Sequence, residues 1–251
     1  MAPYLISLEG NIGSGKSTIL DHLKEHLLYA GSRRIVYVDE PLAQWEKIKN
    51  DQGVSMLQLF YQDPKKYAFS FQMMAYISRL VNLEEAIERH PNCIIMMERS
   101  LMTDYHVFAK MLRETNEILP EEYAIYTQWF DHFNDYPMDA LIYLQCSPET
   151  SLERCNKRNR TGESISLDYM TRVHDHHERW IRESHDNPIL IIDNEDTSLD
   201  DALFCIEDFL MERVIPGDGL HEFVEMYSSY AYLKWALCGL VVSIIAFLQK
   251  T

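Results

Sequence analysis

The stretch GNIGSGKS, residues 10–17, lies between an apolar run at residues 4–8 and an amphipathic run at residues 17–28. It matches the pattern GxxxxGK(S/T) in the strand, loop and helix context that this pattern requires. Its glycines allow a tight turn that points successive N–H groups, together with the helix N-terminus, at phosphate oxygens. The predicted phosphate-binding loop consists of Gly10, Asn11, Ile12, Gly13, Ser14, Gly15, Lys16, Ser17 and Thr18.

Two side chains of this loop have predicted chemical roles. In loops of this kind the lysine, here Lys16, reaches the β- and γ-phosphates of a nucleotide. The hydroxyl of Ser17 reaches Mg²⁺. The loop therefore predicts nucleotide binding, but it leaves the reaction open because one fold hosts many functions.

The rest of the chain alternates between short apolar runs and longer amphipathic ones. Five nearly continuous apolar runs are typical of strands buried on both faces, and they are residues 4–8, 35–38, 93–97, 140–145 and 189–192. Stretches of helical length separate or follow them, at residues 17–28, 69–89, 119–133, 167–184 and 199–214. This alternation predicts an α/β fold in which a five-stranded parallel sheet carries helices on both faces.

Charged residues follow two of the predicted strands. The sequence DEP at residues 39–41 ends the second strand, and ERS at residues 98–100 ends the third. Ligands in such sheets bind outside the carboxyl ends of the strands, so these residues should lie beside the phosphate-binding loop. Glu40 is predicted to accept a proton from an attacking hydroxyl, and Glu98 to hold Mg²⁺ or its waters. Arg99 is predicted to hold the hydroxyl or a phosphate. Two alternatives remain open: Glu40 only caps the N-terminus of a helix, and Glu98 and Arg99 form an ion pair in solvent.

A basic cluster lies further along the chain. Arg154 and Arg158 are four residues apart and share one face of a predicted helix, and Arg160 begins the loop that follows. Such a cluster can close over phosphates as an arginine-rich lid and screen the charge that develops there. In a chain without a phosphate-binding loop, the same residues would be read as a solvated helix face.

Composition limits the partners and the compartment. The formal net charge is −16, which argues against nucleic acid as a partner because phosphate contacts need Lys or Arg. The five cysteines contain no CxxC pair and several lie in apolar runs, which predicts buried free thiols in a reducing compartment. Residues 1–8 are too short for a secretory signal. We therefore expect a cytoplasmic protein.

The C-terminal region differs from the rest of the chain. The sequence PGDG at residues 216–219 precedes an apolar segment at residues 235–248. We expect a catalytic domain at residues 1–214 and an extension at residues 215–251. The apolar segment is either a helix packed on protein or a membrane tail anchor, since its length is close to what a span needs.

Taken together, the motifs resemble those of the cellular and viral deoxynucleoside kinases, in the deoxycytidine and deoxyguanosine kinase branch. GNIGSGKST is similar to the family's GNIxxGKST, and EPLAQW at residues 40–45 is similar to its EPVxxW. Tyr61 precedes Gln72 by eleven residues, as in the family. FQ at 71–72, SR at 78–79 and ERS at 98–100 follow in the family's order, and the resemblance covers roughly residues 4–213.

The resemblance implies a P-loop kinase fold and transfer of the γ-phosphate of ATP, with Mg²⁺, to the 5′-hydroxyl of a deoxynucleoside. It implies that Glu40 is the catalytic base, that Arg99 and Lys16 assist it, and that Ser17 and Glu98 hold the metal. The lid arginines would bind ATP. The implied contacts to the deoxynucleoside are Glu40, Trp45, Tyr61, Phe71, Gln72, Arg79, Arg99, Asp104, Phe108 and Glu163.

Two finer expectations follow from the same resemblance. Arg79 and Asp104 match the pair that reads the base in this family, which implies deoxycytidine and purine deoxynucleosides as substrates in preference to thymidine. The alternative is an Arg–Asp pair that holds two helices together. The resemblance also suggests a homodimer formed through two helices, one of them at residues 69–89.

Two other classes of protein share part of this pattern. A thymidylate-type monophosphate kinase also has a phosphate-binding loop and a Glu-Pro pair, but with Arg before the Glu, where this chain has Asp39. We expect Asp39 to repel a substrate phosphate. A P-loop ATPase or GTPase module tethered to a membrane partner is the other alternative, although NKRN at residues 156–159 departs from the guanine-binding NKxD.

Overall fold

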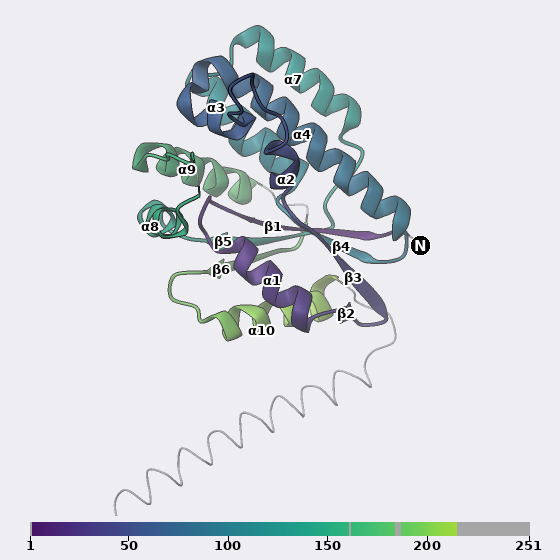
Figure 1. Ribbon diagram of the computed structural model, residues 1–251. Coiled ribbons are helices and arrows are strands. Elements are labelled where there is room, and N and C mark those ends of the chain that lie inside the picture. Colours follow the sequence, from purple (N-terminus) through teal and green to yellow (C-terminus); the bar gives the residue numbers. More distant parts are fainter. Residues whose placement is uncertain (1, 161, 184–186, 215–251) are drawn as a thin grey trace, which may run out of the picture. The chain divides into compact units, whose positions relative to one another are not determined.

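The computed structural model describes residues 2–160, 162–183 and 187–214. The chain divides into two units, residues 1–214 and 215–251, and every described residue belongs to the first (Figure 1). The predicted extension at 215–251, with its apolar segment at 235–248, lies outside the described residues. Within the described part of the chain, no helix combines the length and the apolar character needed to cross a membrane.

The first unit is built on one sheet with strand order β2-β3-β4-β1-β5-β6. The strands are β1 (Tyr4–Gly10), β2 (Tyr29–Ala30), β3 (Arg33–Val38), β4 (Ile94–Glu98), β5 (Ala140–Gln145) and β6 (Ile189–Asp193). Five of them run parallel, as predicted, whereas the two-residue β2 pairs antiparallel with β3. The predicted count of five was therefore wrong by one, because a strand of two residues is too short to produce a periodic pattern.

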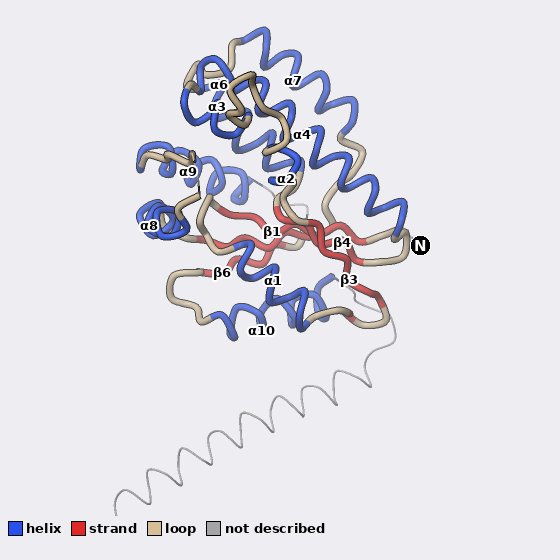
Figure 2. Tube along the Cα trace, viewed as in Figure 1, coloured by secondary structure: helices blue, strands red, loops and turns tan. Residues whose placement is uncertain are grey.

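The centre of the sheet explains why the apolar runs are nearly continuous. β1 lies between β4 and β5, and Figure 2 shows helices above and below these strands. Nearly every residue of the three strands is buried, because both faces of a central parallel strand are covered. The outer strand β6 is less covered, and Ile191 is 54% exposed. All five parallel strands point their carboxyl ends toward the same edge.

The helices cover both faces of the sheet, as predicted. Figure 1 shows α1 and α10 on one side, and α4, α7 and α9 on the other. The segments are α1 (Lys16–His26), α2 (Leu42–Trp45), α3 (Met56–Gln62), α4 (Pro64–Arg89), α5 (Leu101–Thr103), the π-helix η1 (Asp104–Ala109), α6 (Lys110–Glu114), α7 (Pro120–Phe133), α8 (Pro148–Arg158), α9 (Leu167–Glu183), α10 (Leu199–Phe209) and the π-helix η2 (Leu210–Val214).

Helix α4 illustrates how local sequence sets a boundary. It begins five residues before the predicted start at residue 69, because Asp63 accepts a hydrogen bond from the backbone N–H of Lys66 and Pro64 occupies the first turn. Its buried face carries apolar core residues such as Tyr76 and Leu83 together with polar ones such as Arg79. The same helix therefore supports the core and reaches the carboxyl edge of the sheet.

The described cysteines are free, as predicted. Cys146 and Cys155 are buried and Cys93 is partly buried, but Cys205 is exposed on α10, so the prediction of buried thiols fails at that position. Cys205 lies on the outer side of an amphipathic helix that buries Ala202, Ile206 and Phe209. Its neighbours in sequence are apolar, which made an exposed position look buried.

Candidate active site

The carboxyl edge of the sheet encloses one cavity of about 430 Å³. It is lined by residues of the β1–α1 loop, of α4 and of the segments that follow β3 and β4, and by the three predicted lid arginines. The cavity brings together residues that are more than 100 positions apart in the sequence. Every sequence-predicted site residue lines it apart from Gly10, Asn11 and Ser14.

The phosphate-binding loop takes the conformation that its glycines allow. Gly13 and Gly15 have φ angles of 78° and 98°, in the left-handed region. A side chain at Gly13 would also lie 2.4 Å from the carbonyl oxygen of Ser151. Asn11 is buried and fixes the loop from within, because its amide donates to the carbonyl of Met170 at 3.0 Å.

Lys16 lies across this loop and is almost fully buried. Its Nζ donates to the carbonyl oxygens of Gly10 at 3.1 Å and Asn11 at 2.6 Å. Burial and the nearby guanidinium of Arg99 together lower the pKa of Lys16 to about 7, against the opposing effect of Glu98. The ammonium is therefore held by backbone carbonyls in a site where an anion would stabilise its charge.

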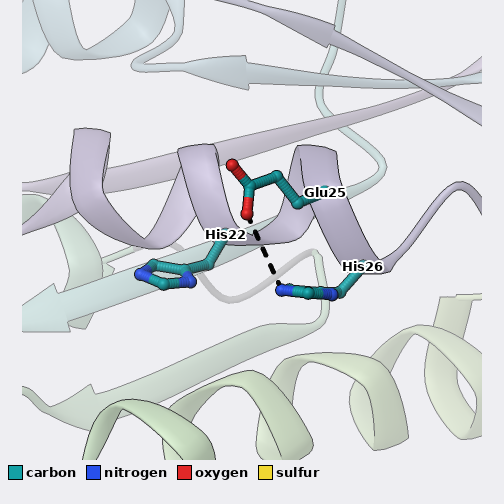
Figure 3. Close-up of side chains that lie close together, drawn as sticks. All are labelled: His22, Glu25 and His26. Atoms are coloured by element: carbon teal, nitrogen blue, oxygen red, sulfur yellow. Dashed lines mark ion pairs between the residues drawn. The ribbon is translucent and has the colours of Figure 1, made fainter.

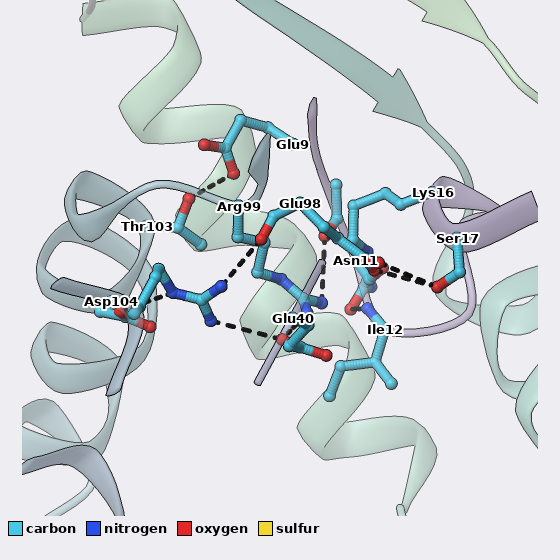
Figure 4. Close-up of polar contacts among 12 residues, drawn as sticks. Glu9, Asn11, Ile12, Lys16, Ser17, Glu40, Glu98, Arg99, Thr103 and Asp104 are labelled. Atoms are coloured by element: carbon cyan, nitrogen blue, oxygen red, sulfur yellow. Dashed lines mark hydrogen bonds and ion pairs between the residues drawn. The ribbon is translucent and has the colours of Figure 1, made fainter. Parts of the chain in front are cut away.

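Ser17 and Glu98 form the pair that could hold a metal. The hydroxyl of Ser17 donates toward both carboxylate oxygens of Glu98, each at 3.1 Å (Figure 4). Both residues line the cavity, Ser17 from the first turn of α1 and Glu98 from the end of β4. A hydroxyl and a carboxylate are oxygen donors of the kind that Mg²⁺ prefers, so this donor set fits that ion.

Glu40 is held by two arginines. Arg99 donates to its Oε1 at 2.6 Å, and Arg79 approaches the same oxygen at 3.4 Å (Figure 4). Burial alone would raise the pKa of Glu40, but attraction to Arg99, Arg79 and Lys16 outweighs burial and lowers the pKa to about 2. The carboxylate is therefore ionised near neutral pH and able to accept a proton from a hydroxyl placed beside it.

Arg79 connects this acid to the opposite wall of the cavity. Its Nε donates to Asp104 at 2.9 Å and its Nη1 to the carbonyl of Glu98 at 2.8 Å. Both members of the Arg79–Asp104 pair have side chains only 3% exposed. Asp104 begins the π-helix η1, which also carries Phe108, and π-helical turns often occur at functional sites.

An aromatic group forms the remaining wall. Phe71 stacks on Phe60 with ring centres 4.8 Å apart. The ring of Trp45 meets that of Phe71 edge-on, with ring centres 5.4 Å apart. Trp45 is fixed by a hydrogen bond from its indole nitrogen to Ser78 at 2.9 Å. Beside them, the side-chain oxygen of Gln72 is buried and has no hydrogen-bond partner among the described residues. A flat polar ligand would satisfy that oxygen.

The lid arginines are not equivalent. Arg158 donates to both carboxylate oxygens of Glu163, at 2.7 and 2.8 Å, and Arg160 lies 4.0 Å from the same carboxylate. Arg154 instead donates to the carbonyl of Ser14 at 3.4 Å and to that of Asn194 at 2.8 Å. Arg154 therefore lies against the phosphate-binding loop.

Tyr61 closes the cavity on the side of Glu163. Burial raises the pKa of Tyr61 well above its ordinary value, and the neighbouring Tyr169 and Glu163 raise it further. Tyr61 is therefore a neutral hydroxyl that can donate or accept a hydrogen bond.

Sequence reasoning missed several residues of this site. Leu57 and Tyr169 line the cavity, and Asn194 donates to the carbonyl of Ser14 at 2.6 Å. Asn194 directly follows β6, so the strand-end rule used for Glu40 could have found it. Leu57 and Tyr169 lie on helices, where nothing in the sequence separates a cavity wall from a core position.

Asp39 does not lie where the sequence argument placed it. Its carboxylate accepts a hydrogen bond from Lys24 on α1 at 2.5 Å, its side chain is 64% exposed, and it is absent from the cavity wall. Both residues follow the end of β3, yet Asp39 lies against α1 whereas Glu40 lines the cavity. The expectation that Asp39 repels a substrate phosphate stays a prediction, although Asp39 does not line the cavity.

One possible metal-binding group lies outside the cavity. His22, Glu25 and His26 share a face of α1, and their ligand atoms lie within 4.8 Å of one another (Figure 3). Glu25 and His26 are exposed, and none of the three lines the cavity. His26 lies roughly 15 Å along the helix from Lys16, since each residue adds about 1.5 Å. This group is therefore separate from the Ser17–Glu98 pair.

Comparison with known proteins places the chain among kinases. The family model described as "Deoxynucleoside kinase" matches residues 6–214. The chain is 33% identical over 224 residues to the probable deoxycytidine kinase of Fowlpox virus, which covers 84% of this chain and 89% of that protein. It is 33% identical over 198 residues to the deoxycytidine kinase of Homo sapiens, covering 70% and 74%. It is 31% identical over 196 residues to the mitochondrial deoxyguanosine kinase of Xenopus laevis, covering 70% and 72%.

Proposed function

The chain belongs to the deoxynucleoside kinase family, and from that premise we propose how its cavity transfers the γ-phosphate of ATP to a deoxynucleoside. The protein is an ATP-dependent kinase that phosphorylates deoxynucleosides for nucleotide salvage. The observation that carries our assignment of roles is the position of Glu40, an ionised carboxylate that shares one cavity with the phosphate-binding loop. The steps below assign each part of that cavity.

ATP occupies the side of the cavity formed by residues 10–18. Backbone N–H groups of the loop and the N-terminus of α1 bind the phosphates, and Lys16 moves from the carbonyls of Gly10 and Asn11 to the β- and γ-phosphates. Ser17 and Glu98 would hold Mg²⁺, which supplies charge neutralisation at the phosphates. Arg154, Arg158 and Arg160 approach the same phosphates from the lid.

The deoxynucleoside occupies the opposite side. Its base lies between Phe71 and Phe108, with Gln72 on the base edge. Tyr61 and Glu163 bind the 3′-hydroxyl. The 5′-hydroxyl then points to Glu40, which takes its proton as the oxygen attacks the γ-phosphorus, and ADP leaves with the departing bridging oxygen. Because phosphoryl transfer needs little covalent work from the protein, positioning and charge provide most of the rate.

The Arg79–Asp104 pair supports a preference for deoxycytidine, deoxyadenosine and deoxyguanosine over thymidine. A buried ion pair is costly unless its remaining donors and acceptors are bonded. One carboxylate oxygen of Asp104 accepts a hydrogen bond from Arg79, and the other can accept one from the edge of a base. The curated relatives named above include deoxycytidine and deoxyguanosine kinases, which agrees with this preference.

We also propose that the protein forms a homodimer through α4 and α7. Apolar side chains are exposed on both helices: Ile77, Val81, Ile125 and Trp129 are 41% to 45% exposed. A second copy would remove these side chains from water. Cytoplasmic localisation stays a prediction. Attachment to a membrane through the C-terminal segment also stays a prediction, because that segment lies outside the described residues.

A transfer assay tests the proposed function. The full chain is incubated with ATP labelled at the γ-phosphate, Mg²⁺ and each of the four deoxynucleosides, and the corresponding deoxynucleoside monophosphates serve as alternative acceptors. We expect label on deoxycytidine and the two purine deoxynucleosides, less on thymidine and none on the monophosphates. Equal or faster turnover of thymidine would refute the base preference, and transfer only to monophosphates would refute the proposed acceptor.

A further inference from the structure

Glu9 is a fully buried carboxylate that has no role in the steps above. It is the next-to-last residue of β1, directly before the phosphate-binding loop. Its Oε1 accepts hydrogen bonds from the backbone N–H of Ser100 at 3.0 Å and from the Ser100 hydroxyl at 2.7 Å. Its Oε2 accepts one from the hydroxyl of Thr103 (Figure 4).

No described cation forms an ion pair with Glu9. A buried carboxylate is costly unless it is hydrogen-bonded, and these three donors supply its hydrogen bonds, while Lys16 and Arg79 attract its charge from further away. Two of these donors belong to Ser100, in the short turn between β4 and α5, and the third belongs to Thr103, the last residue of α5. Glu9 therefore connects the strand that carries the phosphate-binding loop to the turn that carries Arg99.

The turn that Glu9 holds has an unusual backbone. Arg99 has a φ of 61°, in the left-handed region that residues other than glycine adopt only at an energetic cost. Two successive amides fix it there. The N–H of Arg99 donates to the carbonyl of Leu8 at 3.0 Å, and the N–H of Ser100 donates to Glu9. Strained residues persist where their surroundings hold them in place, and they cluster at active sites.

The side chain of Arg99 depends on this backbone. Its guanidinium donates to Glu40 at 2.6 Å and to the carbonyl of Gly10 at 3.4 Å, whereas its Nε has no partner among the described residues. We propose that Glu9 is a positioning residue: by holding Arg99 in its left-handed conformation, it sets the guanidinium against the catalytic carboxylate. This inference rests on the roles proposed above for Arg99 and Glu40.

The substitution Glu9→Gln tests the inference because it keeps the size of the side chain. An amide has one accepting end and no charge, so the Thr103 hydroxyl must turn to accept and the bonds to Ser100 weaken; the turn then relaxes and Arg99 moves away from Glu40. We expect kcat to fall by up to about 100-fold, since displacement by about 1 Å can cost that much. The KM values for ATP and deoxynucleoside should change far less, because Glu9 contacts neither.

The pH profile separates positioning from a merely structural effect. In the native protein Arg99, Arg79 and Lys16 together lower the pKa of Glu40 to about 2, so protonation of Glu40 does not limit the rate above about pH 4. When Arg99 moves away, the largest of these attractions weakens, and burial raises the pKa of Glu40. The acid side of the kcat/KM profile should then fall at higher pH than in the native protein. Titration of the substrates cancels in this comparison.

A matched control is Glu178→Gln. Glu178 is a partly buried carboxylate, and its Oε1 accepts from the hydroxyl of Tyr143 at 2.9 Å and from Gln145 at 2.7 Å. It does not line the cavity. Its loss should lower the thermal midpoint without moving the acid side of the profile. If Glu9→Gln behaves in the same way, the positioning role is overturned.

A double substitution supplies a second test. In an Arg99→Ala background, Glu9→Gln should change kcat by less than about twofold, because its effect passes through Arg99. Losses that multiply would overturn the inference.

Thr103→Val takes the place of Glu9→Gln if the latter does not fold. It removes one donor from Glu9 and should move the acid side of the kcat/KM profile to higher pH as well. A folded Thr103→Val with native kcat and a native profile would contradict the inference. A native kcat in Glu40→Gln would instead refute the proposed function itself.

Discussion

The two halves of the cavity hold their charges in different ways. On the deoxynucleoside side, Glu40, Arg79 and Asp104 form a connected ion-pair network at 2.9 to 3.4 Å. On the ATP side, Lys16 is bound by backbone carbonyls and its pKa is lowered to about 7 by burial. The acceptor half therefore pairs its charges within the protein, whereas the donor half holds its ammonium on uncharged carbonyls, where an anion would stabilise the charge further.

This difference predicts where substitutions act. In a preassembled network, removing one charge leaves its partner buried and unpaired, so stability and catalysis both suffer. In the donor half, a bound phosphate adds to the stabilisation of the Lys16 charge, so changes there should appear in ATP binding and in the pH dependence of that binding. The predictions below test that contrast.

The largest expected effect comes from Asp104→Ala. Removing one partner of a buried ion pair costs about 3–5 kcal/mol of unfolding free energy, because Arg79 stays buried with less compensation. Urea unfolding measures this loss. The same variant should accept thymidine better relative to deoxycytidine, since space opens beside the base. A loss below about 1 kcal/mol, the value for an exposed pair, would show that the network is not preassembled.

Glu40→Gln should come next. Without a general base, kcat should fall by about 100-fold or more, which corresponds to about 2.7 kcal/mol at 1.36 kcal/mol for each factor of ten. The KM of the deoxynucleoside should change little, because the amide still fills the same space. Steady-state transfer of labelled phosphate measures both constants. A kcat near that of the native protein would contradict the role of Glu40.

Much of this site could be predicted from the positions at which the strands end. The glycine pattern, the acid after β3 and the ERS motif after β4 meet because parallel strands bring their carboxyl ends to one edge. That geometry depends on topology alone, so a sequence can predict it. The predicted parallel strands are present for the same reason, since continuous apolar runs indicate strands covered on both faces.

Side-chain direction could not be predicted in the same way. Asp39 and Glu40 are neighbours in sequence, yet one lies on the surface beside Lys24 and the other lines the cavity. The left-handed conformation of Arg99 is equally hidden, because it depends on Glu9 from another strand. Both features depend on contacts between distant segments, which have no local pattern in the sequence.

A smaller effect is expected on the donor side, in the pH dependence of ATP binding. Above pH 7 a growing fraction of Lys16 is neutral, because its pKa is lowered to about 7. The negative charge of ATP favours the ammonium form and raises that pKa, so binding takes up a proton. ATP affinity should therefore weaken by up to about tenfold for each pH unit above 7. Calorimetry in two buffers with different ionisation enthalpies measures the proton uptake.

Lys16→Arg is the control for this experiment. A guanidinium stays charged over the whole range, so the variant should bind ATP without the uptake attributed to Lys16. Equal proton uptake in the native protein and in the variant would assign the titration to another group. The contrast between the two halves of the cavity would then lose its electrostatic basis on the donor side.

The smallest effect is expected for Asp39→Ala, which removes the acid beside Glu40 in the sequence. Because Asp39 pairs with Lys24 at the surface, its loss should cost about 0–1 kcal/mol of unfolding free energy and change kcat by less than about twofold. It should not permit phosphorylation of deoxynucleoside monophosphates. If monophosphates became substrates, Asp39 would act on the cavity from a distance. The acceptor half would then depend on charges outside its buried network as well as on Glu40, Arg79 and Asp104.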